Sequence, residues 1–185
     1  VMIDGWLRDW DDPLNRSKAG YFGSECDGGY AQYTKVSHRQ VHPVDATMSD
    51  AELATFACSY VTAENMLNRG AVTAGDTVLV TGASGGVGSA LIQLANRRGA
   101  KCVALCAADK ADAVKAVGAL AVIDRACADL GSALRDAIGK DSVDVVADVV
   151  GGALWPQLIS ALARGGRYTC AGAIAGPMVE FDLRT

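Results

Sequence analysis

The chain has 185 residues, of which 50% are hydrophobic and 21% charged, and its formal net charge is −4. This length is enough for one large or two small domains with a real core, and the negative charge leaves no basic field for nucleic acid. No apolar run approaches the ~20 residues that cross a bilayer, and the six cysteines form no CxxC pair or zinc-finger spacing, so we expect a reduced cytoplasmic protein with no membrane segment.

The first 45 residues concentrate most of the aromatic side chains among turn-forming residues. Residues 28–36 and 40–44 are predicted to be short strands around a turn, as in a small antiparallel barrel. His38 and His42 lie here, and we expect them to be solvated or structural rather than catalytic. Because the chain starts inside a predicted strand and stops where another crossover is expected, the sequence indicates a part of a longer polypeptide.

Helical signals follow this β-rich part. Ser49 and Glu52 match the capping box S-x-x-E, which predicts a helix start. A second helix is predicted over residues 62–69, ending at Gly70. A turn at Gly75 then leads into the next strand.

An apolar, β-branched strand over residues 77–81 breaks into a glycine cluster and resumes as a helix with one apolar stripe. This order predicts the opening of a nucleotide-binding βαβ unit, in which the N–H groups at the helix N-terminus bind an anion. A simple glycine-rich turn is the alternative, but both flanks favour the nucleotide site. We expect the pyrophosphate over residues 84–87. The turn comprises Gly82, Ala83, Ser84, Gly85, Gly86, Val87 and Gly88.

Strands and helices alternate in the rest of the chain. Strands are predicted at residues 101–106, 120–123, 143–150 and 167–170, and helices at residues 109–117, 130–138 and 154–162. Apolar strands in regular βαβ alternation predict an α/β fold with a doubly wound parallel sheet, which binds ligands outside the carboxyl ends of its strands.

Four motifs, in this order, resemble one family: DGGYAQY at residues 27–33, CSYVTA at 58–63, AGDTVLVTGASGGVG at 74–88 and LARGGR at 162–167. The chain resembles the medium-chain dehydrogenase/reductase superfamily, in its zinc-type alcohol dehydrogenase and quinone oxidoreductase branches. The resemblance implies that residues 1–58 are the end of the first segment of a GroES-like catalytic domain. Residues 59–185 would be a Rossmann-type NAD(P)-binding domain with its first five strands, and the full-length protein a homodimer.

The resemblance also implies roles for single residues. Cys58 aligns with a ligand of the catalytic metal in zinc-dependent members; the alternative is a small buried residue, so Zn²⁺ stays open. Thr62 resembles a threonine near the nicotinamide ring, or it caps a helix. Small residues at strand ends would leave room for adenosine and nicotinamide, or reflect ordinary packing. These are Val150, Ala171, Gly172 and Ala173.

The choice between the two nicotinamide cofactors depends on the tip of the second strand. NAD-binding members place Asp or Glu there to bond the ribose, whereas this strand ends at Cys106 without a carboxylate. Lys110 follows and could reach a 2′-phosphate, or it is a solvated helix lysine. Asp109 could cap the next helix or repel the phosphate. We predict NADP(H) over NAD(H).

The sequence therefore favours an oxidoreductase that moves a hydride between NADP(H) and a small-molecule alcohol or carbonyl substrate. The alternatives are a zinc-free quinone or enone reductase and, in another class, a non-catalytic nucleotide-binding or structural protein on the same fold. Because part of the family's active-site cleft would lie outside this chain, we expect residues 1–185 alone to be inactive.

Overall fold

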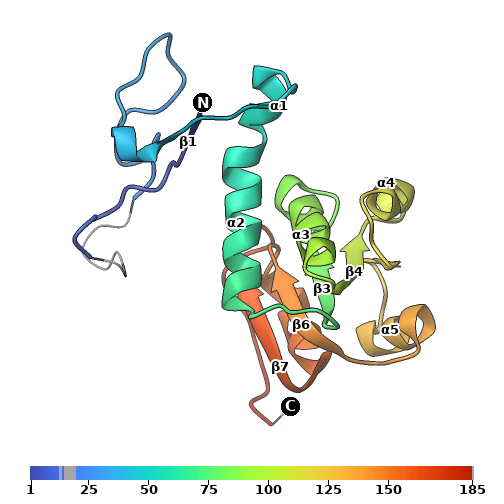
Figure 1. Cartoon of the computed structure of the whole chain (residues 1–185). Helices are drawn as coiled ribbons and strands as arrows, with labels where there is room; N and C mark the ends of the chain where they lie inside the picture. The colour runs from blue at the N-terminus through green and yellow to red at the C-terminus, as the bar shows by residue number, and fades with distance from the viewer. Residues whose placement is uncertain (13, 15–19, 185) are drawn as a thin grey trace. The chain divides into compact units, whose positions relative to one another are not determined.

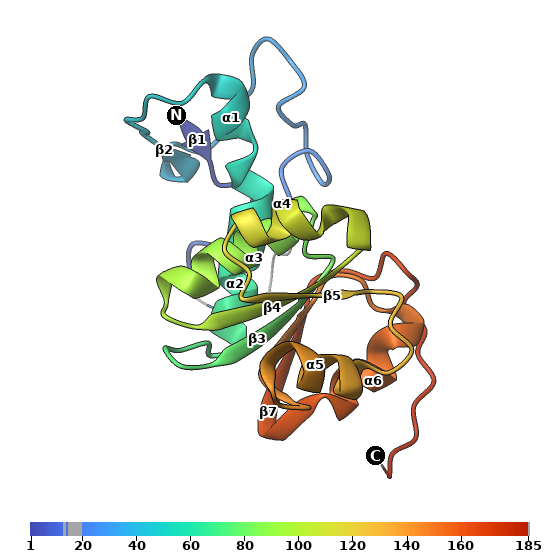
Figure 2. The same ribbon diagram turned by 90° about the vertical axis from the view of Figure 1, so that its right-hand side faces the viewer.

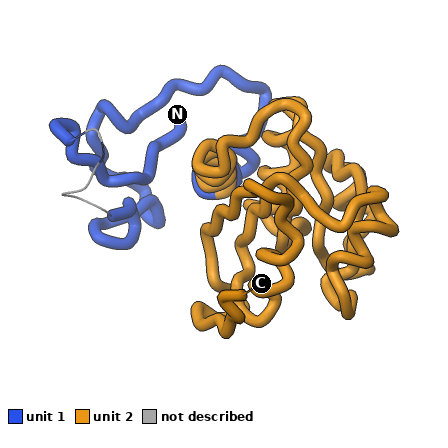
Figure 3. The backbone as a smooth tube through the Cα atoms, turned by 90° about the horizontal axis from the view of Figure 1, so that it is seen from below, with its two compact units in different colours: residues 1–58 blue, residues 59–185 orange. Residues whose placement is uncertain are grey.

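The computed structural model describes residues 1–12, 14 and 20–184. The chain divides into two compact units, Val1–Cys58 and Ser59–Thr185, which Figure 3 shows in separate colours. Among the described residues, no helix is long and apolar enough to cross a bilayer.

The first unit has little regular structure. Strand β1 (Met2–Ile3) pairs antiparallel with β2 (Val41–His42), which follows the 3-10 turn η1 (His38–Gln40). Helix α1 (Asp50–Ala54) begins with the predicted capping box, in which the Ser49 side chain accepts from the Glu52 N–H and the Glu52 carboxylate accepts from the Ser49 N–H at 2.8 Å.

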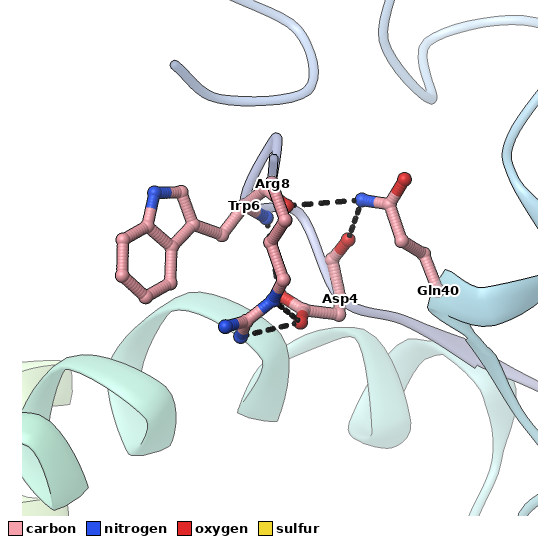
Figure 4. A network of polar contacts seen from close by, with 4 residues as sticks. All are labelled: Asp4, Trp6, Arg8 and Gln40. Carbon is pink, nitrogen blue, oxygen red and sulfur yellow. Dashed lines mark hydrogen bonds and ion pairs between the residues drawn. The ribbon is translucent and has the colours of Figure 1, made fainter. Parts of the chain in front are cut away.

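Gln40 connects the two strands of this unit by its side chain. Its Nε2 donates to the carbonyl oxygens of Asp4 at 2.8 Å and Trp6 at 3.1 Å (Figure 4). Arg8 donates to the Asp4 carboxylate, and its guanidinium lies 4.5 Å from the centre of the Trp6 ring. The Gln40 side chain is largely buried, and its amide satisfies two backbone acceptors. These hydrogen bonds help to hold the short strands β1 and β2 together.

The predicted strand over residues 28–36 is wrong. The segment is irregular and pairs with no strand of the described chain, and Tyr30 and Tyr33 are almost fully exposed. A strand needs a ladder partner and a face to bury, and neither is provided here. The predicted strand over residues 40–44 is confirmed only at β2.

The second unit contains the predicted parallel sheet (Figure 1). Its strand order is β5-β4-β3-β6-β7, and every neighbouring pair is parallel. This order starts in the middle at β3 and runs outward in both directions, so the doubly wound fold is confirmed and its switch point lies between β3 and β6. The strands are β3 (Thr77–Thr81), β4 (Lys101–Cys106), β5 (Ala121–Asp124), β6 (Val143–Asp148) and β7 (Leu162–Cys170).

Helices cover both faces of this sheet, as Figure 2 shows for α3 and α4 on one side and α5 and α6 on the other. Alternate residues of each strand face opposite sides: Val78 and Val80 pack in one core with α2 and α3, whereas Leu79 packs in the other with α5 and α6. The helices are α2 (Phe56–Arg69), α3 (Gly86–Arg97), α4 (Ala111–Ala116), α5 (Leu130–Ile138) and α6 (Trp155–Ser160), with 3-10 turns η2 (Ala108–Lys110) and η3 (Gly152–Leu154).

Several element boundaries differ from the predicted ones. Helix α2 begins six residues before the predicted start at residue 62, and α3 begins at Gly86, inside the predicted glycine turn. Strand β7 begins at Leu162, five residues early, because a register shift lets Leu162 pair with Val143 before the regular ladder resumes. Strand β6 ends at Asp148, because the Asp148 side chain accepts the N–H groups of Val150 and Gly151 and turns the chain.

An ion pair joins the residue before β3 to the middle of β7. Arg167 donates to the Asp76 carboxylate at 2.7 Å and to the carbonyl of Ala71, and Asp76 also accepts the Thr73 N–H at 2.8 Å. Burial by itself raises the pKa of Asp76, but the Thr73 hydrogen bond and the Arg167 charge outweigh it, so the pKa lies below its usual range.

Replacing Asp76 with asparagine is therefore expected to lower the free energy of unfolding by about 1–2 kcal/mol at pH 7. A lowered folded-state pKa contributes stability above the unfolded value of about 3.9 that is lost as the pH falls through the folded value, so the difference from wild type should shrink at pH 3. Denaturant unfolding at both pH values measures this. Asp141→Asn removes an exposed pair with Arg135 and should cost less than about 0.5 kcal/mol; an equal cost at both pH values for Asp76→Asn would contradict the account.

Candidate functional site

The turn between β3 and α3 is shaped by glycines. Gly82 follows the last residue of β3 with φ +55°, in the left-handed region that side chains disfavour. A Cβ atom there would lie 2.8 Å from Cγ2 of Val149, in the loop after β6. Gly82 therefore lets the chain turn and lets a second loop approach.

Gly88 lets α3 pack onto the end of β3. A Cβ atom at this position would lie 2.6 Å from Cα of Ala83 and would overlap the carbonyl oxygen of Gly82. Ala83 and Gly88 are both buried, so they form the inner side of the turn, where α3 packs against the end of β3. Gly86 is close to α2, since a Cβ atom there would lie 2.6 Å from Oγ of Ser59.

The N-terminus of α3 presents backbone donors. Gly85 is its N-cap residue, and the first intrahelical bond runs from the Ser89 N–H to the Gly85 carbonyl. Helix geometry therefore leaves the N–H groups of Gly86, Val87 and Gly88 without intrahelical partners. Ser84, Gly85 and Gly86 are exposed, so an anion can approach this end of the helix.

A pocket of about 360 Å³ lies at the carboxyl ends of the central strands. It brings together five of the predicted site residues: Gly82, Ser84, Cys106, Lys110 and Val150. The other lining residues are Thr81, Leu105, Ala107, Asp109, Arg125 and Leu154. In a doubly wound sheet this is the edge where ligands bind, beside the switch point.

The charges that line the pocket come from the residues after β4 and β5. Lys110 and Asp109 form an exposed ion pair at 3.2 Å. Arg125 is exposed, and its N–H donates to the carbonyl of Cys106 at 2.8 Å. Burial and the carboxylates of Asp109 and Asp124 raise the pKa of Cys106, so this thiol stays neutral.

Arg125 was not among the residues expected from sequence. It follows the third strand of the sheet, whose last residue, Asp124, pairs with Cys106 at the tip of the second. The signal that could have indicated it is the strand order, because in this fold the third strand lies beside the second and its end borders the same pocket.

The remaining predicted residues do not line this pocket. Thr62 is half-buried on α2, and Ala171, Gly172 and Ala173 are exposed after β7. Gly85, Gly86 and Val87 form the adjoining start of α3.

Cys58 belongs to the first unit and is exposed on α2. Within the described part of the chain, no group of three His, Cys, Asp or Glu side chains could hold a metal ion. The residues in hand therefore do not form a zinc site around Cys58.

The chain is similar to known oxidoreductases over most of its length. The sequence profile of the family described as zinc-binding dehydrogenase matches residues 86–185. Acryloyl-coenzyme A reductase from Metallosphaera sedula is 30% identical over 179 residues, which cover 97% of this chain and 52% of that protein. Human quinone oxidoreductase is 27% identical over 155 residues, which cover 83% and 47% of the two chains.

The chain is also similar to solved structures of oxidoreductases. A provisionally assigned alcohol dehydrogenase from Sinorhizobium meliloti superposes with a TM-score of 0.93 at 49% identity, covering 100% of this chain and 51% of that one. The chain thus spans about half the length of the relatives it matches.

Proposed function

The chain belongs to the zinc-binding dehydrogenases of the medium-chain dehydrogenase/reductase superfamily, and the relatives reported above are oxidoreductases. We therefore propose that it binds NADP(H) for hydride transfer to a small-molecule substrate. The observation that carries the proposal is the pocket between the glycine turn and the ends of β4, β5 and β6. The cofactor supplies the hydride chemistry, and the protein binds and orients it. The pyrophosphate lies over residues 84–87, where the N–H groups of Gly86 and Val87 at the start of α3 have no intrahelical partner.

The pocket charges favour NADP(H) over NAD(H). The tip of β4 at Cys106 and Ala107 has no carboxylate to accept the ribose hydroxyls. Among the residues that line the pocket, Lys110 and Arg125 are positively charged and Asp109, which pairs with Lys110, is negatively charged. Asp124 precedes Arg125 at the end of β5 and does not line the pocket. A planar guanidinium also matches a phosphate in a bidentate arrangement, so Arg125 is our first choice for the 2′-phosphate contact.

Replacing Arg125 with alanine is expected to weaken NADPH binding about tenfold and leave NADH binding unchanged, because only NADPH carries the 2′-phosphate. Lys110→Ala should also weaken NADPH binding relative to NADH binding, and so reduce the preference for NADPH. Dissociation constants for both cofactors, measured by nicotinamide fluorescence, check this. Lys115→Ala, on α4 and outside the pocket lining, is the matched control. A wild-type preference for NADH would mean that Asp109 turns to the ribose and that the phosphate assignment is wrong.

We propose an alcohol or carbonyl compound as the substrate, in line with the likeness to the Sinorhizobium protein. Thr62, together with Ala171, Gly172 and Ala173, is our assignment for the nicotinamide end, and Val150 for the adenosine end. No step is assigned to zinc, since the described residues include no group of three His, Cys, Asp or Glu side chains that could hold the ion. Cytoplasmic location and homodimerisation of the full-length protein remain parts of this proposal.

Reduction of an activated double bond is the second candidate. Acryloyl-coenzyme A reductase, two crotonyl-CoA reductases and quinone oxidoreductase are among the relatives, and their names favour it.

Loss of NADPH absorbance, followed in the full-length protein, tests both candidates. Oxidation of NADPH with an aldehyde or ketone supports the first, and oxidation with an enone, a quinone or an enoyl thioester supports the second. If the protein binds NADPH but oxidises it with none of these compounds, it is a non-catalytic nucleotide-binding protein and the proposal is wrong.

A further inference from the structure

Asp148, the last residue of β6, is a fully buried carboxylate. Its Oδ1 accepts from Oγ1 of Thr81 at 2.5 Å and from the Val150 N–H at 2.8 Å. Its Oδ2 accepts from Oη of Tyr168 at 2.6 Å, and the Gly151 N–H reaches both oxygens at 3.2 Å. Four donors satisfy the carboxylate, which compensates for removing the charge from water.

These hydrogen bonds join the carboxyl ends of three neighbouring strands. Thr81 ends β3, Asp148 ends β6 and Tyr168 lies on β7. Thr81 is bonded twice, since Oγ1 also accepts the N–H of Val149 at 3.0 Å. The group therefore spans the switch point of the sheet, where β3 and β6 are adjacent.

Tyr168 serves this group as a fixed donor. Burial, followed by the hydrogen bond to Asp148, raises the pKa of Tyr168 well above its usual value, so its hydroxyl stays protonated. Its ring packs edge-on against Trp155, with ring centres 6.0 Å apart, and Tyr168 does not line the pocket. Tyr168→Phe can therefore remove the donor while the ring stays in place.

The loop that Asp148 fixes forms part of the pocket wall. Val150 lines the pocket together with Thr81 and Gly82. The side chains of Val149 and Val150 occupy the space that a Cβ atom on Gly82 would take, at 2.8 and 3.3 Å. Any shift of this loop changes its contact with the first residue of the glycine turn.

We propose that Asp148 is a positioning residue for dinucleotide binding, which holds the loop over residues 149–151 against the glycine turn so that the pocket has the shape of its ligand. Asp148 itself touches no cofactor. The inference rests on the proposed function, because it takes the pocket to be the dinucleotide site.

A second carboxylate on the same strand is the matched control. Asp144 is near the opposite end of β6, and its Oδ2 accepts the N–H of Thr77 at 2.8 Å. Asp144→Asn removes the same charge from the same strand without touching the pocket wall. A merely structural role for Asp148 would give the two variants the same phenotype: lower stability and unchanged affinity.

The experiment titrates wild type, Asp148→Asn, Tyr168→Phe and Asp144→Asn with NADPH, at a temperature where circular dichroism shows each protein folded. We expect Asp148→Asn to raise the dissociation constant about tenfold, Tyr168→Phe a few-fold and Asp144→Asn not at all. Because Asp148 and Tyr168 share one hydrogen bond, the double variant should bind less weakly than the two single effects combined predict.

Unchanged affinity in folded Asp148→Asn overturns the inference. If that variant does not fold, Tyr168→Phe replaces it: weaker binding supports the inference and wild-type affinity overturns it. Wild-type protein that binds neither NADPH nor NADH overturns the proposed function, and the inference with it, so the two failures are distinguishable.

Discussion

Replacing Gly88 with alanine is expected to lower the free energy of unfolding by about 3 kcal/mol. The new methyl group would lie 2.6 Å from Cα of Ala83 and would overlap the carbonyl of Gly82, and both neighbours are backbone atoms that cannot rotate away. Helix α3 must then move from β3, which disrupts the packing of the central strand. Denaturant unfolding measures the change.

Gly85→Ala is the control for this variant within the same turn. Gly85 has an extended backbone, with φ −84° and ψ 173°, and a Cβ atom there would have only the Gly82 carbonyl nearby, at 3.3 Å. We expect it to cost less than about 1 kcal/mol. A Gly88→Ala protein as stable as Gly85→Ala would show that the helix does not rest on the turn in this way.

Replacing Gly85 with valine is expected to weaken dinucleotide binding about 100-fold while the protein stays folded. The extended backbone accepts a branched residue, so the fold should tolerate it. Its side chain would, however, occupy the exposed end of α3 where a pyrophosphate must approach the N–H groups of Gly86 and Val87. Titration with NADPH, together with circular dichroism, measures both parts of this expectation.

Gly131→Val is the matched control for Gly85→Val. Gly131 lies in the first turn of α5, outside the pocket lining, and a Cβ atom there would meet its nearest neighbour at 3.7 Å. The Gly131→Val protein should bind NADPH with wild-type affinity. If folded Gly85→Val also binds NADPH with wild-type affinity, the pyrophosphate does not lie over residues 84–87.

The second unit was predictable from sequence because its signals are local. Apolar β-branched strands, helices with one apolar stripe and glycines between them define a doubly wound sheet without knowledge of long-range contacts. The glycine turn was found in the same way, since Gly82, Gly85 and Gly88 stand where the apolar strand pattern changes to the helical one.

What the sequence did not reveal depends on contacts between distant residues. Arg125 borders the pocket only because β5 lies beside β4. Strand β6 ends at Asp148 because that carboxylate turns back to the loop while it binds Thr81, 67 residues earlier. The predicted strand over residues 28–36 had suitable residues but pairs with no strand in the part of the chain that the structure describes, and pairing cannot be inferred from a single segment.

The central claim is that the glycine turn and the pocket beside it bind a nicotinamide dinucleotide with its 2′-phosphate. The most direct test is to titrate the wild-type chain with NADPH and with NADH, following the fluorescence of the bound nicotinamide, and to compete each with 2′,5′-ADP. We predict saturable binding of both, NADPH tighter by about tenfold, and displacement by 2′,5′-ADP. No saturable binding of either dinucleotide, or tighter binding of NADH, would contradict the account.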